Sequence, residues 1–110
     1  MNQTVQLNPA AMRAAASQAC GLLKVLANPD RLLLLCQLMQ GPLCVSELEN
    51  ILGIQQPTLS QQLGVLRDEA LVTTRREGKQ IFYSTASGEA MAVMQVLYQL
   101  YCETPNGATS

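Results

Sequence analysis

The sequence predicts a mainly α-helical domain that carries one small β-hairpin. The chain has 110 residues, which fits a single domain. Hydrophobic residues make up 48% of it and aromatic residues only 4%, a composition that favours helices over a β-sandwich. Apolar residues recur at helical spacing along most of the chain, and only residues 71–85 change to strand-like runs. We expect one folded domain over residues 10–103, between flexible tails at 1–9 and 104–110.

The first two helices are separated by Asn28-Pro29. Residues 10–27 are rich in alanine, and their apolar positions predict a helix with one apolar stripe. Asn28 can cap the next helix, and Pro29 suits its first turn. Residues 32–39 are apolar on so many sides that we expect this second helix to be deeply buried, and Gly41-Pro42 to end it. The stripe of the first helix consists of Ala15, Ala16, Ala19, Leu22, Leu23 and Leu26.

Two further helices are separated by a turn with glycine. Ser46 and Glu49 have the spacing of a capping box, which predicts a short helix that Gly53 ends. A second helix begins near Pro57 and ends near Ala70, with an apolar stripe at four- and three-residue spacing. A short helix, a glycine turn and a second helix are the signature of a helix-turn-helix. The stripe consists of Leu59, Leu63 and Leu66.

The helix-turn-helix is followed by the predicted hairpin and a last helix. Residues 71–76 and 80–85 are the two β-rich runs, and residues 77–79 form a tight turn with glycine. Ser87 caps a final helix whose apolar residues have helical spacing. A hairpin directly after a helix-turn-helix makes a winged helix-turn-helix. The apolar residues of the last helix are Met91, Met94, Leu97, Tyr98 and Tyr101.

The polar face of the second helix of the unit is typical of a DNA-reading surface. The net charge of the chain is only −1, so a nucleic-acid partner has to be argued from local features. Glutamine can bind adenine through two hydrogen bonds, and hydroxyls reach base edges or phosphates. A merely solvated helix face would usually carry glutamate and lysine instead. The face consists of Gln55, Gln56, Thr58, Ser60, Gln61 and Gln62, with no acidic residue before Asp68.

Four of the seven cationic side chains cluster beside this helix. They are Arg67, Arg75, Arg76 and Lys79, and three of them bracket the hairpin turn. Such side chains can straddle phosphates or enter a minor groove, which identifies the hairpin as a DNA-contacting wing. The alternative is an ordinary charged hairpin that Glu77 partly neutralises. The expected partner is double-stranded DNA, bound by a symmetric dimer at an inverted repeat.

Several functional classes are disfavoured by what the chain lacks. It has no histidine, which removes the commonest general base and the commonest zinc ligand. It also has no C-x-x-C motif and no glycine-rich phosphate loop, so we do not expect an enzyme. We find no signal peptide and no membrane-length apolar run, and expect a cytoplasmic protein with no membrane partner. In that compartment Cys20, Cys36, Cys44 and Cys102 are expected to be buried, metal-bound or redox-active rather than a disulfide framework.

The sequence resembles the ArsR/SmtB family of bacterial winged-helix repressors over about residues 18–102. Within this family it is most similar to the BigR/SqrR/YgaV-type repressors. The resemblance implies a homodimer through the first and last helices, with residues 56–67 in the major groove and residues 75–80 as the wing. The matching segments are LKVLANPDRL (23–32), VSEL (45–48), QPTLSQQLGVLR (56–67), RREGKQIFY (75–83) and LYC (100–102).

The resemblance points to sulfur rather than metal as the signal. One metal-site type of the family matches residues 42–48, but there Ser46 replaces the second thiolate beside Cys44, and another type needs histidine. We therefore expect no metal and no cofactor. Cys36 and Cys102 match the two cysteines of the BigR/SqrR-like members. This match implies reaction with persulfide or other sulfane sulfur, which gives a disulfide or polysulfide bridge within one subunit and releases DNA.

The roles of the individual cysteines are left open by the residues themselves. We expect Cys102 near the C-terminus to attack and Cys36 to resolve the adduct. Free cysteine is also a common small buried hydrophobe, and Cys36 fits that role equally on pattern alone. Cys20 is expected to pack within the first helix, and Cys44 to be a loop or cap residue. A response to another oxidant or to a metal, or an anti-silencer role like that of HlyU-like relatives, stays open.

Overall fold

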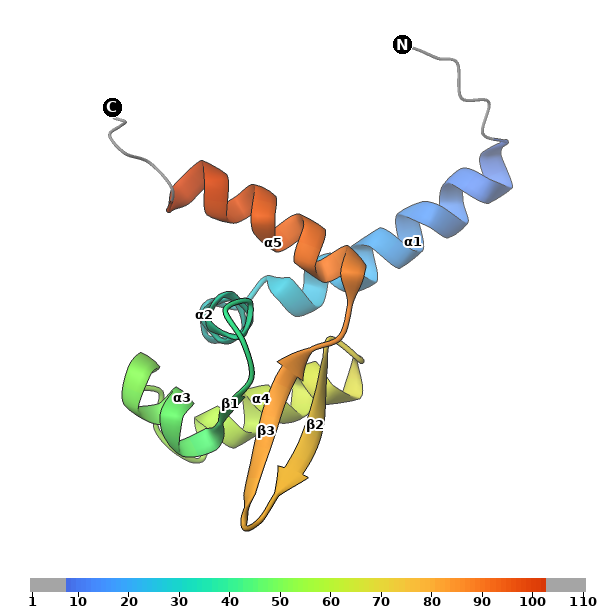
Figure 1. Ribbon diagram of the computed structural model, residues 1–110. Helices are drawn as coiled ribbons and strands as arrows, with labels where there is room; N and C mark the ends of the chain where they lie inside the picture. The colour runs from blue at the N-terminus through green and yellow to red at the C-terminus, as the bar shows by residue number, and fades with distance from the viewer. Residues whose placement is uncertain (1–7, 103–110) are drawn as a thin grey trace.

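Helix α2 (Pro29–Leu38) lies at the centre of the fold and contacts each of the other four helices. The computed structural model describes residues 8–102. Figure 1 shows α1 and α5 on one side of α2, and α3, α4 and the strands on the other side. In chain order the elements are α1 (Pro9–Leu26), α2, β1 (Leu43–Cys44), α3 (Val45–Leu52), α4 (Thr58–Asp68), β2 (Val72–Glu77), β3 (Gln80–Thr85) and α5 (Gly88–Tyr101).

The predicted winged helix-turn-helix is confirmed. Helices α3 and α4 are joined through Gly53, which caps the C-terminus of α3 with a φ of 71°. Glycine takes this left-handed conformation without steric cost, which is why the short helix ends here. Strands β2 and β3 then pair antiparallel as the wing.

The sheet contains a third strand that the sequence analysis missed. Strand β1 pairs antiparallel with β3, with Leu43 opposite Tyr83 and Cys44 opposite Phe82, so the strand order is β1-β3-β2. Two residues are too few to show the alternation of side chains that marks a strand. The pairing ties the wing to the start of α3, because α3 follows β1 directly.

The wing turn is shorter than predicted. Glu77 pairs with Gln80, so the connection consists of Gly78 and Lys79 rather than of residues 77–79. Gly78 has a φ of 64°, which suits the first central position of a two-residue hairpin turn. The shorter turn places Lys79 at the tip of the wing, beside the last strand pair.

The predicted cap of α3 is wrong by two residues. The helix begins at Val45, so the cap position belongs to Cys44, and Ser46 lies in the first turn. The Cys44 N–H donates a hydrogen bond to the Glu47 carboxylate at 3.0 Å, which is the return contact of a capping box. Cys44 therefore has the cap role expected for it, and strand β1 sets the register by ending at the same residue.

The other two predicted caps are confirmed. The side-chain oxygens of Asn28 and Ser87 each accept a hydrogen bond at 3.0 Å from the backbone N–H group three residues later. Such bonds satisfy N–H groups that the first turn of a helix leaves unpaired. They fix the starts of α2 and α5.

The predicted N-terminal tail is wrong at its last two residues. Asn8 accepts a hydrogen bond from the Ala11 N–H at 2.7 Å and so caps α1, which begins at Pro9. The rest of the predicted tails, residues 1–7 and 104–110, lies outside the described residues. Between residues 8 and 102, no helix is both long and apolar enough to cross a membrane.

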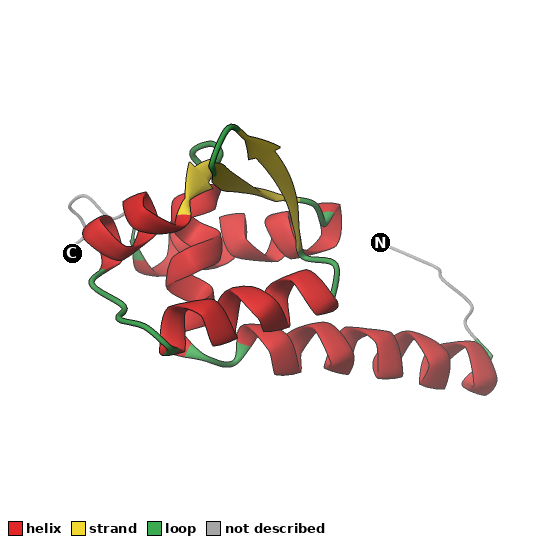
Figure 2. Ribbon diagram, turned by 90° about the horizontal axis from the view of Figure 1, so that it is seen from below, coloured by secondary structure: helices red, strands yellow, loops and turns green. Residues whose placement is uncertain are grey.

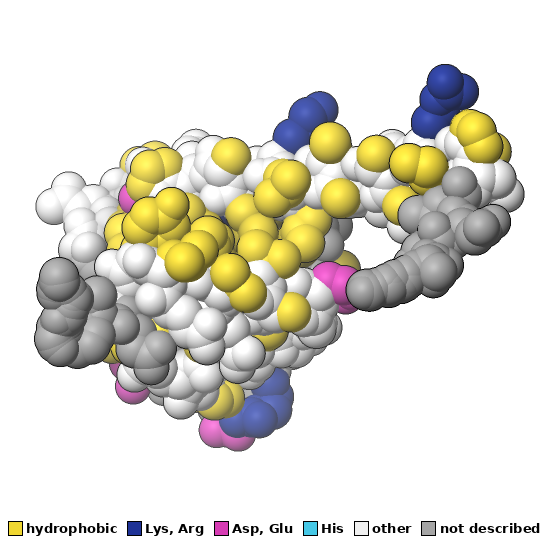
Figure 3. Space-filling model, turned by 90° about the horizontal axis from the view of Figure 1, so that it is seen from above, with side chains coloured by type: hydrophobic (Ala, Val, Ile, Leu, Met, Phe, Trp, Pro, Cys, Tyr) yellow, Lys and Arg dark blue, Asp and Glu magenta, His cyan; other side chains and the backbone are white. Residues whose placement is uncertain are grey.

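Helix α1 projects from the body of the fold, as Figures 1 and 2 show. Only Val25 and Leu26, at its C-terminal end, are buried. Of the predicted apolar stripe, Leu22 is half-buried and the three alanines and Leu23 are exposed. Figure 3 shows hydrophobic side chains gathered along and beside this helix. Much of the stripe is therefore uncovered within one chain, and Cys20 is exposed rather than packed.

The hydrophobic core lies between α2 and the helix-turn-helix. The prediction that α2 is deeply buried holds for three of its leucines, but Leu33 is 47% exposed and Cys36 is half-buried. These two residues lie on the side of α2 that does not enter the core. The core leucines with least exposure are Leu34 and Leu35 of α2, Leu48 of α3, and Leu59, Leu63 and Leu66 of α4.

Truncation of Leu48 tests this core. Leu48→Ala is expected to lower the free energy of unfolding by about 2–5 kcal/mol, because the variant loses buried methyl groups and leaves a cavity. Ile51, on the same helix and 52% exposed, provides the control, and Ile51→Ala is expected to cost less than about 1 kcal/mol. Urea unfolding followed by circular dichroism measures both. Equal losses in the two variants would contradict the burial of Leu48.

Candidate nucleic-acid interface and dithiol cleft

Helix α4 is held by its buried side and presents the opposite side outward. Leu59, Leu63 and Leu66 are buried in the core, so the rotation of the helix about its own axis is fixed. Ser60, Gln61 and Val65 are exposed. Figure 1 shows α4 and the wing on the same side of the molecule, away from α1 and α5.

Most of the predicted DNA-contacting residues are exposed. Thr58 and Gln62 are half-buried, because both lie at the flanks of the α4 face. The exposed set spans the turn before α4, the helix itself and the wing, so the fold brings together segments up to 24 positions apart (79 − 55). The exposed members are Gln55, Gln56, Ser60, Gln61, Arg67, Arg75, Arg76 and Lys79.

The four glutamines of this surface are not equivalent. Gln56 Oε1 accepts a hydrogen bond from the Ser60 N–H at 3.1 Å, within the first turn of α4. Gln62 Oε1 accepts a hydrogen bond from Arg31 Nη1 at 2.8 Å. Within residues 8–102, the side chains of Gln55 and Gln61 make no such bond, so both keep an oxygen acceptor and an amide donor. An amide with both groups free can turn both of them toward one adenine edge, which the two-bond contact requires.

Charge on the wing is partly compensated. Arg75 Nη2 lies 2.8 Å from Glu77 Oε2, and both side chains are more than half exposed. An exposed pair of this kind contributes little to stability and exchanges readily with solvent and salt. In the described part of the chain Arg76 and Lys79 have no acidic partner, so they carry the positive charge near the tip. Arg75 and Arg76 are successive strand residues and point to opposite faces of the hairpin.

Two distant cysteines line one cleft. Cys36 on α2 and Cys102, which follows α5, face a cavity of about 290 Å³. The two residues are 66 positions apart (102 − 36), and the contact between α2 and α5 brings them together. Both thiols are free. The rest of the lining is apolar or aromatic and consists of Leu32, Leu33, Met94, Leu97, Tyr98 and Tyr101.

The two thiols of the cleft differ in environment. Burial raises the pKa of the Cys36 thiol above its usual value, and the nearby Cys102 acts in the same direction. Cys36 therefore favours its neutral form at pH 7. Cys102 is exposed at the end of α5 and accessible to small reagents. These environments match the expected division into an attacking Cys102 and a resolving Cys36, which stays a prediction.

The other two cysteines lie elsewhere. Cys20 is exposed on α1, and Cys44 is buried at the base of the wing, with its Sγ 3.3 Å from Ser46 Oγ. Within residues 8–102, no three side chains of His, Cys, Asp or Glu lie together as a metal-binding group. The cysteine set therefore divides into one pair in the cleft and two separate residues.

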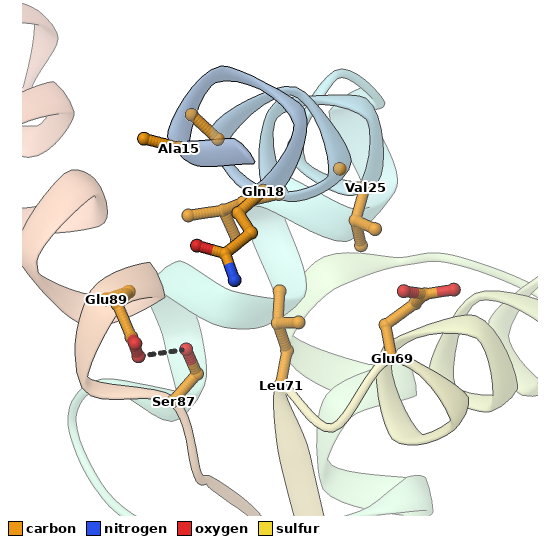
Figure 4. A pocket seen from close by; sticks show the side chains of 10 residues that line it. Ala15, Gln18, Val25, Glu69, Leu71, Ser87 and Glu89 are labelled. Atoms are coloured by element: carbon orange, nitrogen blue, oxygen red, sulfur yellow. Dashed lines mark hydrogen bonds between the residues drawn. The ribbon is translucent and has the colours of Figure 1, made fainter. Parts of the chain in front are cut away.

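A larger pocket that the sequence gave no sign of lies between α1, the α4–β2 connection and the start of α5 (Figure 4). Its volume is about 640 Å³, and Gln18, Glu69 and Glu89 are its polar and charged rim. Ser87 Oγ donates a hydrogen bond to Glu89 at 3.5 Å, within the first turn of α5. None of the predicted site residues lines this pocket.

Arg31 is the functional candidate that sequence analysis missed. It lies in the first turn of α2 and reaches α4 through Gln62, 31 positions later. Its place in the family-like segment 23–32 gave no indication of this contact. A contact so distant in sequence has no local signal.

The fold and the exposed surface define a winged-helix DNA-binding regulator. The helix-turn-helix presents an amide-rich second helix, and the wing carries exposed cations next to it. This pairing of a reading helix with a cationic hairpin is the arrangement by which such proteins contact a groove and the phosphates beside it.

Comparison with known proteins identifies the family. Residues 28–74 match "Bacterial regulatory protein, arsR family". The chain is 53% identical over 92 residues to the biofilm growth-associated repressor of Agrobacterium fabrum. These residues make up 84% of this chain and 79% of that protein. It is 40% identical over 97 residues to the transcriptional activator HlyU of Vibrio cholerae, covering 88% and 90%. The crystal structure of the transcriptional repressor BigR from Xylella fastidiosa matches with a TM-score of 0.80 and 43% identity, covering 94% and 100%.

The chain therefore belongs to the arsR family of bacterial regulatory proteins. Its relatives are regulators of transcription rather than enzymes. The family assignment agrees with the resemblance read from the sequence.

Substitution of Gln61 and Arg76 separates base reading from phosphate contact. Gln61→Ala is expected to weaken operator binding without changing its salt dependence, because an amide displaces no counterion. Arg76→Ala is expected to weaken binding and to lower the slope of log affinity against log salt by about 1. Thr73→Ala, exposed on the same strand, is the control. Fluorescence anisotropy over a salt series measures all three, and unchanged binding by both variants would remove this interface.

Proposed function

We propose that this protein is a DNA-binding transcriptional repressor that senses reactive sulfur through Cys36 and Cys102. Oxidation of the two thiols by a persulfide or another sulfane-sulfur donor releases the protein from its operator. The observation that carries the proposal is the shared cleft, in which both cysteines take part despite their distance in sequence. A relative with 53% identity is named a repressor, which supports the direction of regulation.

The DNA side of the proposal uses α4 and the wing. Helix α4 enters the major groove with its exposed side, and the wing places Arg76 and Lys79 beside the phosphates. Exposure of these residues and of Gln61 supports the arrangement. One such unit reads only a few base pairs, so two units on an inverted repeat are needed for a specific site.

A homodimer through α1 and α5 supplies the second unit. The apolar stripe of α1 is largely uncovered in one chain, and several large apolar residues of α5 are exposed as well. Exposed apolar surface of this kind marks a protein interface. Of the α5 residues, Val96 is 53%, Leu100 65% and Tyr101 78% exposed.

The thiol chemistry proceeds in two displacement steps. The Cys102 thiolate attacks the terminal sulfur of a persulfide RS–SH, which forms a Cys102 persulfide and releases RSH. The Cys36 sulfur then attacks the Cys102 Sγ, which forms the Cys36–Cys102 disulfide and releases H₂S. In sum, two thiols are oxidised by two electrons, and the transferred sulfur atom is reduced to sulfide. A second persulfide molecule can convert Cys36 to a persulfide as well; the outer sulfur of the Cys102 persulfide then attacks the Cys36 Sγ, which forms a trisulfide bridge and releases H₂S.

A bridge across the cleft acts on the DNA-binding unit through α2. This helix contacts α5 on the thiol side and α3 and α4 on the other side. A hundredfold loss of operator affinity corresponds to about 2.7 kcal/mol, which is within the usual range of coupling between two sites. Closure of a covalent loop of this length has an effect of comparable size, about 4 kcal/mol in the chain-entropy treatment.

Activation of transcription is the second candidate function. A relative with 40% identity over 97 residues is named the transcriptional activator HlyU. An activator or anti-silencer would use the same DNA contacts and the same two thiols. Transcription from the operator promoter with and without the protein distinguishes the two directions.

Single cysteine variants test the sensing mechanism. Cys36→Ser and Cys102→Ser are expected to bind the operator like the unmodified protein, yet to stay bound when an organic persulfide is added, because neither can form the bridge. Cys20→Ser, an exposed cysteine outside the cleft, is the control and is expected to release DNA normally. Anisotropy follows DNA release, and mass spectrometry of the intact protein identifies the sulfur product.

The inducer is identified by separate exposure of the protein to persulfide, glutathione disulfide and peroxide. Persulfide is expected to give the bridged product together with DNA release. Release from either single variant would show that the two-thiol mechanism is wrong. DNA release with peroxide but not with persulfide would support the two-thiol mechanism and identify peroxide rather than persulfide as the inducer.

Alkylation rates test the two thiol environments. Iodoacetamide at pH 7.5 is expected to modify Cys102 before Cys36, because Cys102 is exposed. Burial raises the pKa of Cys36, so its reactive thiolate forms at higher pH than in an ordinary thiol. The rate at Cys36 is therefore expected to keep rising at pH values where free N-acetylcysteine has levelled off. Peptide mass spectrometry gives both rates, and earlier modification of Cys36 would contradict the assignment.

A further inference from the structure

Arg31 joins three helices through its guanidinium group. Nε donates a hydrogen bond to the backbone oxygen of Val25 at 2.6 Å, and Nη2 to that of Lys24 at 3.3 Å. Both carbonyls lie in the last turn of α1, where a helix has no internal partners for them. Nη1 donates to Gln62 Oε1 on α4 at 2.8 Å. The guanidinium is thus held at three points, and it holds the Gln62 side chain in turn.

The bond determines which end of the Gln62 amide is available to a ligand. A guanidinium donates hydrogen bonds and accepts none, so the amide oxygen must face Arg31. The NH₂ group is then the part of the amide left for another partner. Gln61 differs, because its side chain makes no hydrogen bond within residues 8–102 and keeps both functions. Two neighbouring glutamines therefore offer different chemistry.

We propose that Arg31 is a positioning residue, which holds Gln62 as a hydrogen-bond donor toward an acceptor on the DNA. Reading of adenine by glutamine needs the oxygen to accept from N6 while the nitrogen donates to N7. Because Oε1 is turned toward Arg31 at 2.8 Å, Gln62 does not present both groups of its amide to one base edge, as this two-bond contact requires. Its partners are acceptors: a purine N7, guanine O6, thymine O4 or a phosphate oxygen.

The half-buried position of Gln62 supports this role. The side chain lies on the flank of α4 that faces α2, where Arg31 is also half-buried. An amide fixed before binding loses less conformational entropy when it meets DNA. The inference rests on the proposed placement of α4 against DNA, and it adds a rule for what one position of that helix can read.

Four variants test the inference against an operator library in which each base pair is replaced in turn. Gln62→Met, which removes donor and acceptor at nearly constant shape, is expected to lower affinity for the preferred operator about three- to tenfold. Arg31→Met frees the Gln62 amide, so the variant is expected to bind operators with adenine at the contacted position more tightly, relative to the other bases, than the unmodified protein does. Arg31→Lys still offers a donor to Gln62 and is expected to keep the original preference. The double variant Arg31→Met/Gln62→Met is expected to have the same base preference as Gln62→Met alone, because Arg31 acts through Gln62.

The two sources of an acceptor are separated with modified DNA. If the acceptor is a base edge, Gln62→Met flattens discrimination at one position of each half-site, and 7-deazapurine or base replacement there has no further effect. If it is a phosphate, the loss is the same for every base, and one methylphosphonate linkage reproduces it in the unmodified protein. Both results support a donor-only Gln62.

Three results would overturn the inference. One is a wild-type binding profile in both Gln62→Met and Arg31→Met. Another is a changed profile in Arg31→Met that persists in the double variant. The third is a preference of the unmodified protein for adenine that is lost in Gln62→Met.

Circular dichroism melts check the fold of each variant, and Gln62→Met carries the test if Arg31→Met unfolds. If Gln61→Ala and Arg76→Ala also leave binding unchanged, the proposed interface itself fails; if they weaken it, only the role of Arg31 and Gln62 falls.

Discussion

The packing of α2 against all four other helices is the constraint on which both candidate sites depend. Its leucines Leu34 and Leu35 are fully buried, so α2 cannot shift without disturbing its neighbours. The same helix carries Arg31 and, five residues later, Cys36. The two side chains leave the helix about 140° apart and about 7.5 Å apart along its axis. Cys36 thus faces the cleft with α5, while Arg31 faces α1 and α4. Because the interior is close-packed, a displacement of α2 at the cleft would be transmitted to α1 and α4 rather than absorbed locally.

The small net charge fits a regulator whose affinity for DNA depends on the placement of its hydrogen-bonding groups. With a net charge of −1 the chain gains little from general attraction to DNA. Helix α4 presents exposed amides and hydroxyls, and Arg76 and Lys79 are cations near the wing tip that have no acidic partner in the described residues. Hydrogen bonds of this kind require correct placement, whereas charge attraction tolerates misplacement. A small change in the position of α4 or in the spacing of two proposed subunits therefore has a large effect on specific binding.

Local signals in the sequence predicted the elements, and distant contacts escaped them. Apolar spacing, Asn28 and Gly53 located the helices and the turn correctly. Strand β1 was missed because it exists only through its pairing with β3, and that pairing also moved the cap of α3 to Cys44. The family resemblance alone indicated that Cys36 and Cys102 belong to one site, since a separation of 66 positions (102 − 36) carries no local signal. The contact between Arg31 and Gln62 had no indication for the same reason. The apolar stripe of α1 was read correctly as a pattern, but one chain does not cover it.

Amide hydrogen exchange tests most directly whether α2 couples the two thiols of the cleft to helix α4. The DNA-free protein is compared in its reduced form and with Cys36 and Cys102 joined. Coupling through α2 predicts that the bridge changes exchange in residues 58–62, on the far side of α2, as well as around the cysteines. Changes confined to residues 32–36 and 94–102, with α4 unaffected, would contradict it.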